Sequence, residues 1–309
     1  MDRNNIVYSV VVPVYRAEKT LVELITRLKK ILNEITSAYE IILVEDCGGD
    51  GSWEIMKKLH NEGPRIKIIQ LMTNFGQHNA IMCGFHHAKG EFIITMDDDL
   101  QNPPEEIPKV INKMQEGYDI VYGEYISKQH NTFRNFGALM IQFVYKKVFK
   151  LDHNPTAFRI VKRDIIQSIL RYDKNYVFLD GLLAWCTKNV GYTPVVHEKR
   201  SGGKSGYSFI KLITLSLNMV TNFSIFPLQL ATILGLLFAI IGFLMGLYFL
   251  FKKIFFGVPV EGFTSLIIAV TMFSGIQLLT LGLIGEYLGR VHLNINNKPQ
   301  FLVREKHPD

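Results

Sequence analysis

Three consecutive aspartates, Asp97 to Asp99, lie in the stretch TMDDDLQNPPEEIP at residues 95–108. Neighbouring carboxylates repel one another, so the run is either a solvated acidic turn or a binder of some cation. Residues two apart on an extended strand end point the same way, which places Asp97 and Asp99 on one side and Asp98 opposite, toward the scaffold. With the amide oxygen of Gln101 they offer hard oxygen ligands, which suit Mg²⁺ or Mn²⁺ bridging substrate phosphates. We therefore predict a binding site for a divalent cation and a diphosphate.

Two further stretches have residues that suit a nucleotide. PVYRAE covers residues 13–18, and EDCGGD covers residues 45–50. Asp46 and Asp50 suit hydrogen bonds to a base or ribose, and the glycines beside them allow close backbone approach. The sequence has no GxGxxG, GxxxxGK[ST] or GxSxG motif, so it favours neither a dinucleotide fold, nor a P-loop, nor a serine-hydrolase elbow.

Strands and helices are predicted to alternate through the first 125 residues. The expected strands are residues 6–15, 40–46, 65–72, 91–99 and 119–125, and the expected helices are residues 20–35, 52–60, 79–88 and 108–116. This order predicts an α/β, doubly wound, mostly parallel sheet, in which ligands bind at the carboxyl ends of the strands. The three stretches above follow the first, second and fourth strands. Each alone is also typical of an ordinary turn, but together they predict one common site.

Two long uncharged segments lie toward the C-terminus. Leu228 to Phe251 has 24 residues, about 36 Å as a helix, which spans a bilayer core of about 30 Å. Gly262 to Gly285 has the same length but includes Thr, Ser, Gln and Gly. A buried helical hairpin in a soluble core is the alternative. We predict two transmembrane helices, because two such segments lie back to back.

Lysines and arginines flank the segments on their outer sides, whereas the loop between them has only Lys252 and Lys253 with Glu261 opposing. The positive-inside rule then predicts that the N-terminal domain and the C-terminal tail are both cytoplasmic, and that the protein is a multi-pass protein of the inner (cytoplasmic) membrane. The predicted parts are an N-terminal α/β domain (1–200), a juxtamembrane amphipathic helix (201–226), two transmembrane helices (227–288) and a tail (289–309). No signal peptide is expected, and the three separated cysteines indicate a reducing compartment without a disulfide framework or zinc site.

Several motifs in this order resemble one enzyme family. They are PVYRAE, EDCGGD, NFGQHNAI, DDDLQNPPEEIP, Phe133-Arg134, FRIVKR and RSGGKSGYS, followed by the two apolar segments. This combination is similar to the family 2 glycosyltransferases of GT-A fold, and within them to the polyprenyl-phosphate glycosyltransferases. These include dolichol-phosphate mannose synthase, undecaprenyl-phosphate glucosyltransferases and undecaprenyl-phosphate formyl-aminoarabinose transferase. The likeness runs from about Val10 to the tail.

The resemblance implies roles for individual residues. Asp97, Asp99 and Gln101 match the metal site, with Asp97 matching a residue that contacts the nucleotide or the metal. The residues implied around the nucleotide are Pro13, Tyr15, Glu18, Asp46, Asp97 and Asp98. The implied partners are Mg²⁺ or Mn²⁺, a nucleotide-diphosphate sugar (a UDP-sugar favoured) and a polyprenyl phosphate, and tetramers occur in this family. The chain departs from the family pattern at Arg16, Ala17 and Thr73, and the acidic residue expected before FRIVKR does not align with Asp152.

A lipid phosphate is anionic at neutral pH, so positioning and charge control matter more than a strong general base. Arginine offers a bidentate fork to such a phosphate. The candidates to hold the acceptor are Arg134, Arg159, Lys162 and Arg200, with solvated surface charge as the alternative. The catalytic set, with inversion in one displacement, is then Asp97, Asp99, Arg134, Arg159 and Arg200.

A site that joins a soluble donor to a lipid acceptor must lie at the membrane surface. Residues 132–150 and 205–223 have apolar and basic residues at helical spacing, so we predict two interfacial helices, with core-facing helices as the alternative. A processive polysaccharide synthase would need more spans and a QxxRW-like motif, which the chain lacks. A non-catalytic nucleotide-sugar sensor would need no acceptor site, and a pI of 9.0 is weak support for nucleic-acid binding. His78, His86, His87 and His197 lack metal-ligand spacing and are expected to be structural.

Overall fold

The structure is a computed structural model that describes residues 6–125, 155–174, 177–198, 226–256, 262–296 and 298–307. The chain forms two compact units. The first consists of residues 1–212 and 297–309, and the second of residues 213–296. The predicted interfacial helices, Arg134 and Arg200 lie outside the described residues, so these predictions stay open.

Four parallel strands form the centre of the first unit, in the order β4-β1-β2-β3. They are β1 (Tyr8–Val14), β2 (Tyr39–Glu45), β3 (Ile66–Leu71) and β4 (Phe92–Thr95). The valines of β1 and the aliphatic residues of β2 are fully buried, as expected for strands covered on both faces. These four predicted strands are confirmed, but β4 ends at Thr95, before the aspartate run.

Four more strands extend this sheet to eight, in the order β7-β5-β6-β4-β1-β2-β3-β8. They are β5 (Ile120–Tyr125), β6 (Arg159–Lys162), β7 (Val190–Val195) and β8 (Val303–His307). β6 is antiparallel to β4 and β5, and β8 is antiparallel to β3. Only β6 and β8 run against the other six strands of this sheet, so the sheet is mixed but mostly parallel, as predicted.

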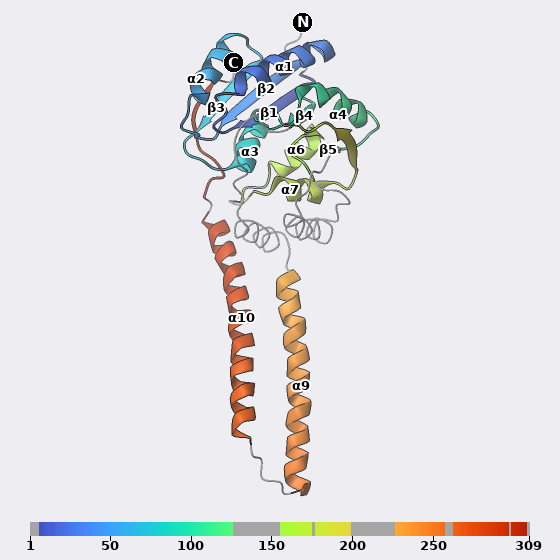
Figure 1. Ribbon diagram of the computed structural model, residues 1–309, viewed down its shortest axis with the longest axis vertical. Coiled ribbons are helices and arrows are strands. Elements are labelled where there is room, and N and C mark those ends of the chain that lie inside the picture. The colour runs from blue at the N-terminus through green and yellow to red at the C-terminus, as the bar shows by residue number, and fades with distance from the viewer. Residues whose placement is uncertain are drawn as a thin grey trace. The chain divides into compact units, whose positions relative to one another are not determined.

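Helices cover both faces of the sheet (Figure 1). One face has α1 (Leu21–Ile35), α2 (Ser52–Asn61), the short η1 (Pro104–Glu106) and α4 (Ile107–Met114), which share a core with alternate residues of β1. The other has α3 (Gln77–His87), α6 (Arg163–Ile169) and α7 (Leu179–Cys186). α3 packs so closely on β1 that a Cβ at Gly84 would lie 2.3 Å from Val11 Cγ1. The doubly wound arrangement is confirmed.

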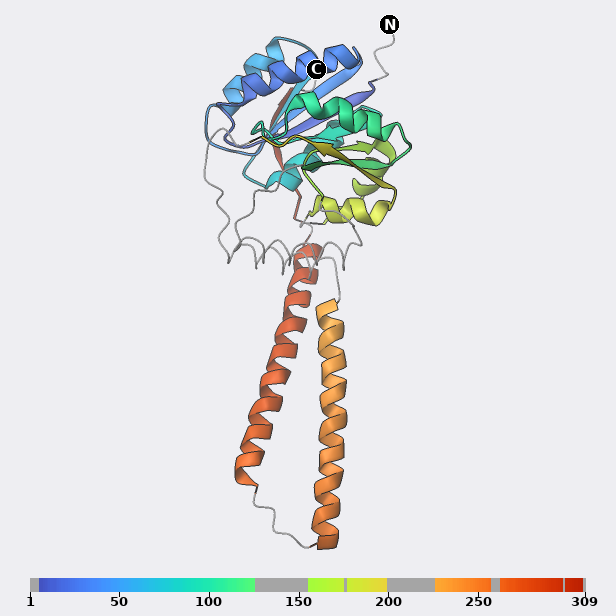
Figure 2. The ribbon, with the colours of Figure 1, turned by 45° about the vertical axis from the view of Figure 1, so that its right-hand side comes forward.

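The described part of the second unit consists of two long helices, α9 (Phe226–Phe256) and α10 (Phe263–Ile295), drawn in orange and red in Figure 2. Within α9, Leu228–Phe256 has a mean hydropathy of 2.5 and is not buried. Among the described residues, α9 is the one helix whose length and composition suit a membrane span. The second predicted span stays a prediction.

Candidate active site

The loops after β1, β2 and β4 interlock at the carboxyl edge of the sheet. Tyr15 N–H donates to Asp98 Oδ2 at 2.8 Å, which joins the β1 loop to the β4 loop. Arg16 Nε donates to the Gly48 carbonyl at 3.0 Å, which joins the β1 loop to the β2 loop. The predicted convergence of the three stretches on one edge is therefore confirmed.

Backbone strain is concentrated in the same loops. Among the described residues, three that are not glycine have positive φ: Arg16 at 56°, Cys47 at 53° and Leu100 at 60°. One lies after each of the strands β1, β2 and β4. Such conformations cost about 1–3 kcal/mol each and persist where the surrounding structure imposes them, commonly at functional sites.

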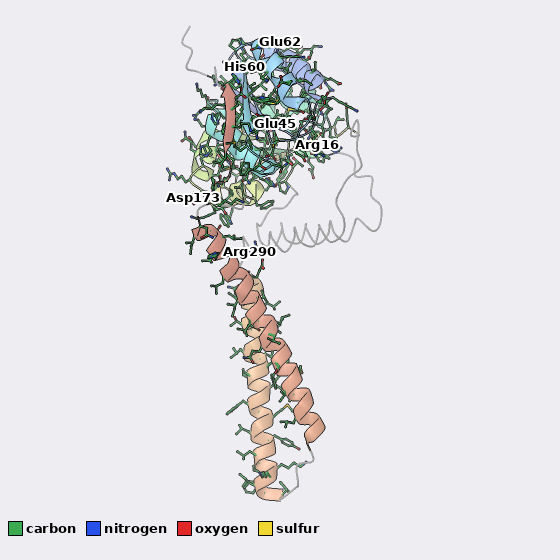
Figure 3. All side chains as sticks on the ribbon, turned by 90° about the vertical axis from the view of Figure 1, so that its left-hand side faces the viewer. Arg16, Glu45, His60, Glu62, Asp173 and Arg290 are labelled. Carbon is green, nitrogen blue, oxygen red and sulfur yellow. The ribbon has the colours of Figure 1, made fainter. Side chains whose placement is uncertain are left out.

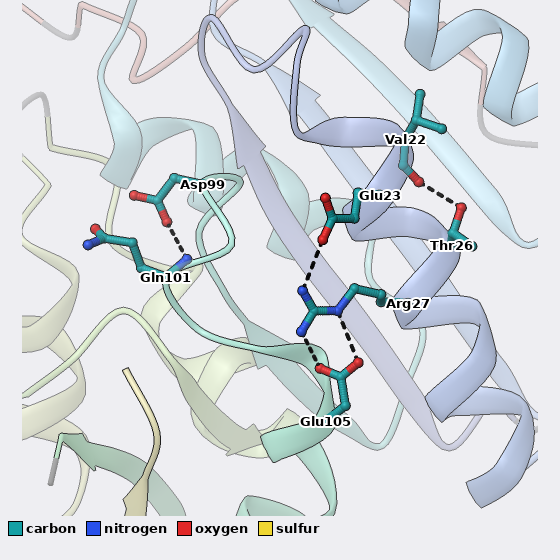
Figure 4. A network of polar contacts seen from close by, with 7 residues as sticks. All are labelled: Val22, Glu23, Thr26, Arg27, Asp99, Gln101 and Glu105. Atoms are coloured by element: carbon teal, nitrogen blue, oxygen red, sulfur yellow. Dashed lines mark hydrogen bonds and ion pairs between the residues drawn. The ribbon is translucent and has the colours of Figure 1, made fainter. Parts of the chain in front are cut away.

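Each aspartate of the triplet has its own partner. Gln77 Nε2 donates to Asp97 Oδ1 at 2.6 Å, Tyr15 N–H to Asp98, and Gln101 N–H to Asp99 Oδ1 at 3.1 Å (Figure 4). The alternation expected for a strand does not apply, because β4 ends at Thr95 and Leu100 has positive φ. Asp98 binds the β1 loop, and the turn at Leu100 brings Gln101 back to Asp99.

The glutamates that follow the triplet have a structural role. Arg27 of α1 holds Glu105 with two hydrogen bonds, at 3.0 and 2.6 Å (Figure 4). Hydrogen bonding to Arg27 lowers the pKa of Glu105. Glu106 is mostly buried and accepts Val196 N–H at 3.1 Å. These contacts attach η1 to α1 and to the residues after β7, and so fix the end of the acidic loop.

The triplet concentrates negative charge in a partly buried loop. Burial, followed by the charges of Asp99 and Asp98, raises the pKa of Asp97 to about 7, although Arg159 and the Gln77 hydrogen bond act in the opposite direction. The described residues form no group of three His, Cys, Asp or Glu side chains that could hold a metal. Mg²⁺ is commonly held by one or two carboxylates plus substrate phosphates, and Asp99 with Gln101 fits that shared arrangement.

Asp46 organises the loop between β3 and α3. It is 3% exposed, and its two oxygens accept Phe75 N–H at 2.7 Å and Gly76 N–H at 2.8 Å. Burial raises its pKa, while these two bonds lower it. Its neighbour Glu45, labelled in Figure 3, accepts Gly48 N–H at 2.6 Å. Carboxylates from the end of β2 and just beyond it thus hold both the predicted nucleotide loop after β2 and the loop between β3 and α3.

The remaining predicted nucleotide residues differ in accessibility. Pro13 is a buried residue of β1, whereas Tyr15 is 45% exposed. The Arg16 guanidinium lies 5.2 Å from the centroid of the Tyr15 ring. Glu18 accepts Gly51 N–H at 3.2 Å. Tyr15 and Arg16 therefore offer an exposed aromatic face and a cation at this edge.

The candidate acceptor ligands occupy different places. Arg159 is 2% exposed, pairs with Asp180, and donates from Nε to Thr95 Oγ1 at 3.1 Å. Lys162 Nζ bonds Asp119 at 2.9 Å, and its strand partner is Phe92, the first residue of β4. Lys162 therefore lies at the amino edge, away from the triplet, and its predicted acceptor role is wrong.

Arg200 itself lies outside the described residues, but the chain just before it is described. Arg200 follows Glu198 by two residues, and Glu198 N–H donates to the Gln101 carbonyl at 2.9 Å. The backbone that leads to Arg200 is therefore bonded directly to the acidic loop.

Comparison with known proteins decides the family. Residues 9–170 match the family described as Glycosyl transferase family 2, which is more than half of the chain. The chain belongs to this family. It is 34% identical to the undecaprenyl-phosphate 4-deoxy-4-formamido-L-arabinose transferase of Proteus mirabilis over 302 residues, 96% of this chain and 93% of that protein. It is 35% identical to the Klebsiella pneumoniae protein of the same name, over 96% of this chain and 92% of that protein.

The fold of this family 2 glycosyltransferase also matches solved structures. A mycobacterial protein aligns with a TM-score of 0.52 and 14% identity, over 70% of this chain and 72% of that chain. At this identity the match concerns the fold alone, and it agrees with a GT-A-like α/β arrangement with a mixed sheet.

The structure adds residues to the glycosyltransferase site that the sequence did not predict. Gln77 binds Asp97, and Asp180 pairs with Arg159. The His197 ring stacks on Tyr125 at 4.0 Å; burial lowers its pKa, and the charge of Asp99 raises it. One feature of the sequence could have indicated Gln77 as a site residue. It is a polar residue directly after Gly76 of the NFG motif, at a turn from a strand to a helix. Asp180 and His197 had no local signal, because their partners are distant in sequence.

Proposed function

We propose that this glycosyltransferase moves a sugar from a nucleotide-diphosphate sugar to undecaprenyl phosphate or a similar polyprenyl phosphate. The observation that carries the proposal is the near full-length likeness to the Proteus mirabilis transferase. The interlocked loops around Asp97 to Asp99 support it, because they bring candidate diphosphate and nucleotide residues to one sheet edge. A UDP-sugar is the favoured donor.

The proposed reaction is a single displacement. An oxygen of the lipid phosphate, anionic because its second pKa is about 6, attacks the anomeric carbon of the sugar. The bond from that carbon to the diphosphate oxygen breaks, and the nucleoside diphosphate leaves with the electron pair. The anomeric configuration inverts, and no strong general base is required.

Asp99 and Gln101, with Asp97 beside them, would hold a divalent cation together with the donor diphosphate. When bound, Mg²⁺ or Mn²⁺ offsets the negative charge that builds up on the leaving group. Burial raises the pKa of Asp97 to about 7, and the charges of Asp99 and Asp98 act in the same direction. A cation would offset this concentration of negative charge, which supports the assignment. Tyr15 and Arg16 would contact the nucleotide part of the donor.

Arg200 and Arg134 are the proposed direct contacts of the acceptor phosphate. The hydrogen bond from Glu198 N–H to the Gln101 carbonyl supports Arg200, because Arg200 is only two residues beyond a backbone bonded to the acidic loop. Arg159 is already paired with Asp180, so we propose that it supports the acceptor site through its charge from the protein interior.

Two membrane crossings follow from the connectivity of the chain if α9 spans the bilayer. β8 comes after α10 and pairs with β3 of the first unit, so the chain returns to the unit that it left. Between α9 and β8, α10 is the described helix long enough to cross back, at 33 residues. This supports a multi-pass protein, and the lysines and arginines that flank the two apolar segments support a cytoplasmic location for its catalytic unit.

The direct test uses purified full-length protein in vesicles that contain undecaprenyl phosphate. A panel of nucleotide sugars is supplied with Mg²⁺ or Mn²⁺, and the lipid product is identified by its mass. We expect one donor to yield a polyprenyl-phosphate sugar, with EDTA stopping the reaction. The absence of a product from every donor would refute the transferase proposal.

A further inference from the structure

The segment directly after α10, residues 298–304, crosses the loops that support the candidate site, and is called the C-terminal strap below. We propose that the strap is a positioning element that holds the β3–α3 loop (residues 72–77) in the conformation that binds the nucleotide-sugar donor. This deepens the proposed function and rests on it.

The strap engages both backbone polar groups of Met72, the first residue of this loop. Met72 N–H donates to the Leu302 carbonyl at 2.8 Å, and an Arg304 terminal nitrogen donates to the Met72 carbonyl at 3.0 Å. The β3–β8 pairing is irregular between Gln70 and Leu71. Leu71, the last residue of β3, pairs with Val303, so the position of the end of β3 and of the start of the loop depends on the strap.

The far end of the loop binds the candidate site. Phe75 and Gly76 donate their N–H groups to Asp46, and Gln77 donates to Asp97. Met72 is held by the strap and Gln77 by the acidic triplet, with four residues between them. A loop that is fixed at both ends keeps one conformation. A bound nucleotide then has to order the loop less, which favours binding.

The strap also holds a second loop that leads to the site. Gln300 Nε2 donates to the carbonyls of Tyr172 and Lys174, at 2.7 and 3.0 Å. The chain after Lys174 leads to Phe178, whose ring meets His78 of α3 edge-on at 5.7 Å, and then to Asp180, which pairs with Arg159. One segment therefore fixes two loops that approach the triplet from different elements.

The strap also contacts α3. The Phe301 ring lies 5.7 Å from the ring of His86, in the last turn of α3. The strap therefore touches the helix that follows the β3–α3 loop as well as the first residue of that loop.

The test measures binding of UDP, with Mn²⁺, to the full-length protein in lipid nanodiscs. We expect Gln300→Ala with Arg304→Ala to weaken UDP binding about tenfold, the equivalent of about one hydrogen bond. Using Arg304→Lys instead of Arg304→Ala should keep most of the affinity for UDP, because lysine can still donate to the Met72 carbonyl. Lys306→Ala is the matched control on the same strand and should leave affinity unchanged.

A second readout separates positioning from general stability. Hydrogen exchange of the Phe75 and Gly76 amides should become faster in the double variant at temperatures well below its Tm. A lower Tm with UDP affinity and these two exchange rates unchanged would overturn the proposal. If the unmodified protein binds no UDP, the proposed function is in question, and the exchange of the two amides still decides the role of the strap.

Discussion

At the scale of single residues, the acidic stretch divides into two parts with different roles. Asp97, Asp98 and Asp99 accept hydrogen bonds from Gln77, Tyr15 and Gln101 respectively, whereas Glu105 and Glu106 are held by Arg27 and Lys109. In the first part, burial and crowded charge raise the pKa of Asp97 to about 7, whereas in the second the Arg27 bond lowers that of Glu105. We therefore expect substitutions in Asp97 to Asp99 to have different effects from substitutions of Glu105 and Glu106.

Asp99→Asn should abolish most of the metal-dependent turnover, because an amide oxygen is a weaker ligand than a carboxylate oxygen. We expect kcat/KM to fall by about 100-fold or more, since even residues that orient metal ligands are worth about 10- to 100-fold. The measurement is product formation across a Mn²⁺ titration, with the exposed Asp164→Asn as control. Undiminished turnover at low Mn²⁺ would show that the ligand is assigned wrongly.

Arg16→Ala should raise the KM for the donor by about tenfold with a smaller change in kcat, because it removes an exposed cation from a site rich in carboxylates that must accept a diphosphate. Arg65→Ala is a matched control. Arg65 also stacks on a tyrosine, with its guanidinium 4.8 Å from the Tyr39 ring, but it directly precedes β3, at the opposite edge of the sheet. An equal rise of KM in both variants would contradict a local role for Arg16.

At the scale of elements, Asp119 links β5, β6 and the turn after α7. It accepts hydrogen bonds from Lys162 Nζ at 2.9 Å and Thr187 Oγ1 at 2.8 Å. These bonds, Lys162 first, lower its pKa in the folded protein. The link therefore stabilises the fold above the unfolded aspartate pKa of about 3.9, and this contribution is lost as the pH falls through the lower folded value.

Asp119→Asn should consequently lower the Tm at neutral pH, with the difference from the unmodified protein shrinking below about pH 4. Thermal unfolding across a pH series measures this, and Asp164→Asn is the control for loss of an exposed aspartate. A Tm difference that stays constant from pH 7 to below the folded pKa would contradict the assigned link.

At the scale of the whole molecule, the pairing of β8 with β3 constrains the membrane topology. A cysteine introduced by Gly262→Cys, between α9 and α10, should be labelled by an impermeant thiol reagent in intact cells. A cysteine introduced by Lys298→Cys should react only after permeabilisation. The exposed native Cys186 is replaced in both variants. Labelling of both positions in intact cells would indicate a single crossing.

The sequence alone determined the features that depend on neighbours along the chain. Helical periodicity, β-branched runs and turn residues predicted the first five strands and the four helices between them, and the length of Leu228 to Phe251 predicted the apolar helix α9. The motif set also predicted the family. These signals are local, because side-chain spacing and backbone preference act over a few residues.

Only the tertiary structure decided how distant segments pair. β6 begins and ends with a basic residue, β7 includes Pro194, and β8 includes Arg304, Glu305 and Lys306, so local patterns did not indicate them. The tertiary structure also places Lys162 at the amino edge of the sheet, pairs Arg159 with Asp180, and places Gln77 within hydrogen-bond distance of Asp97. Such pairings depend on the sheet order, which joins β8 to β3 across more than 200 residues of chain. Because of that long-range pairing, Leu302 and Arg304 support a loop of the site that begins at Met72, more than 200 residues earlier in the chain.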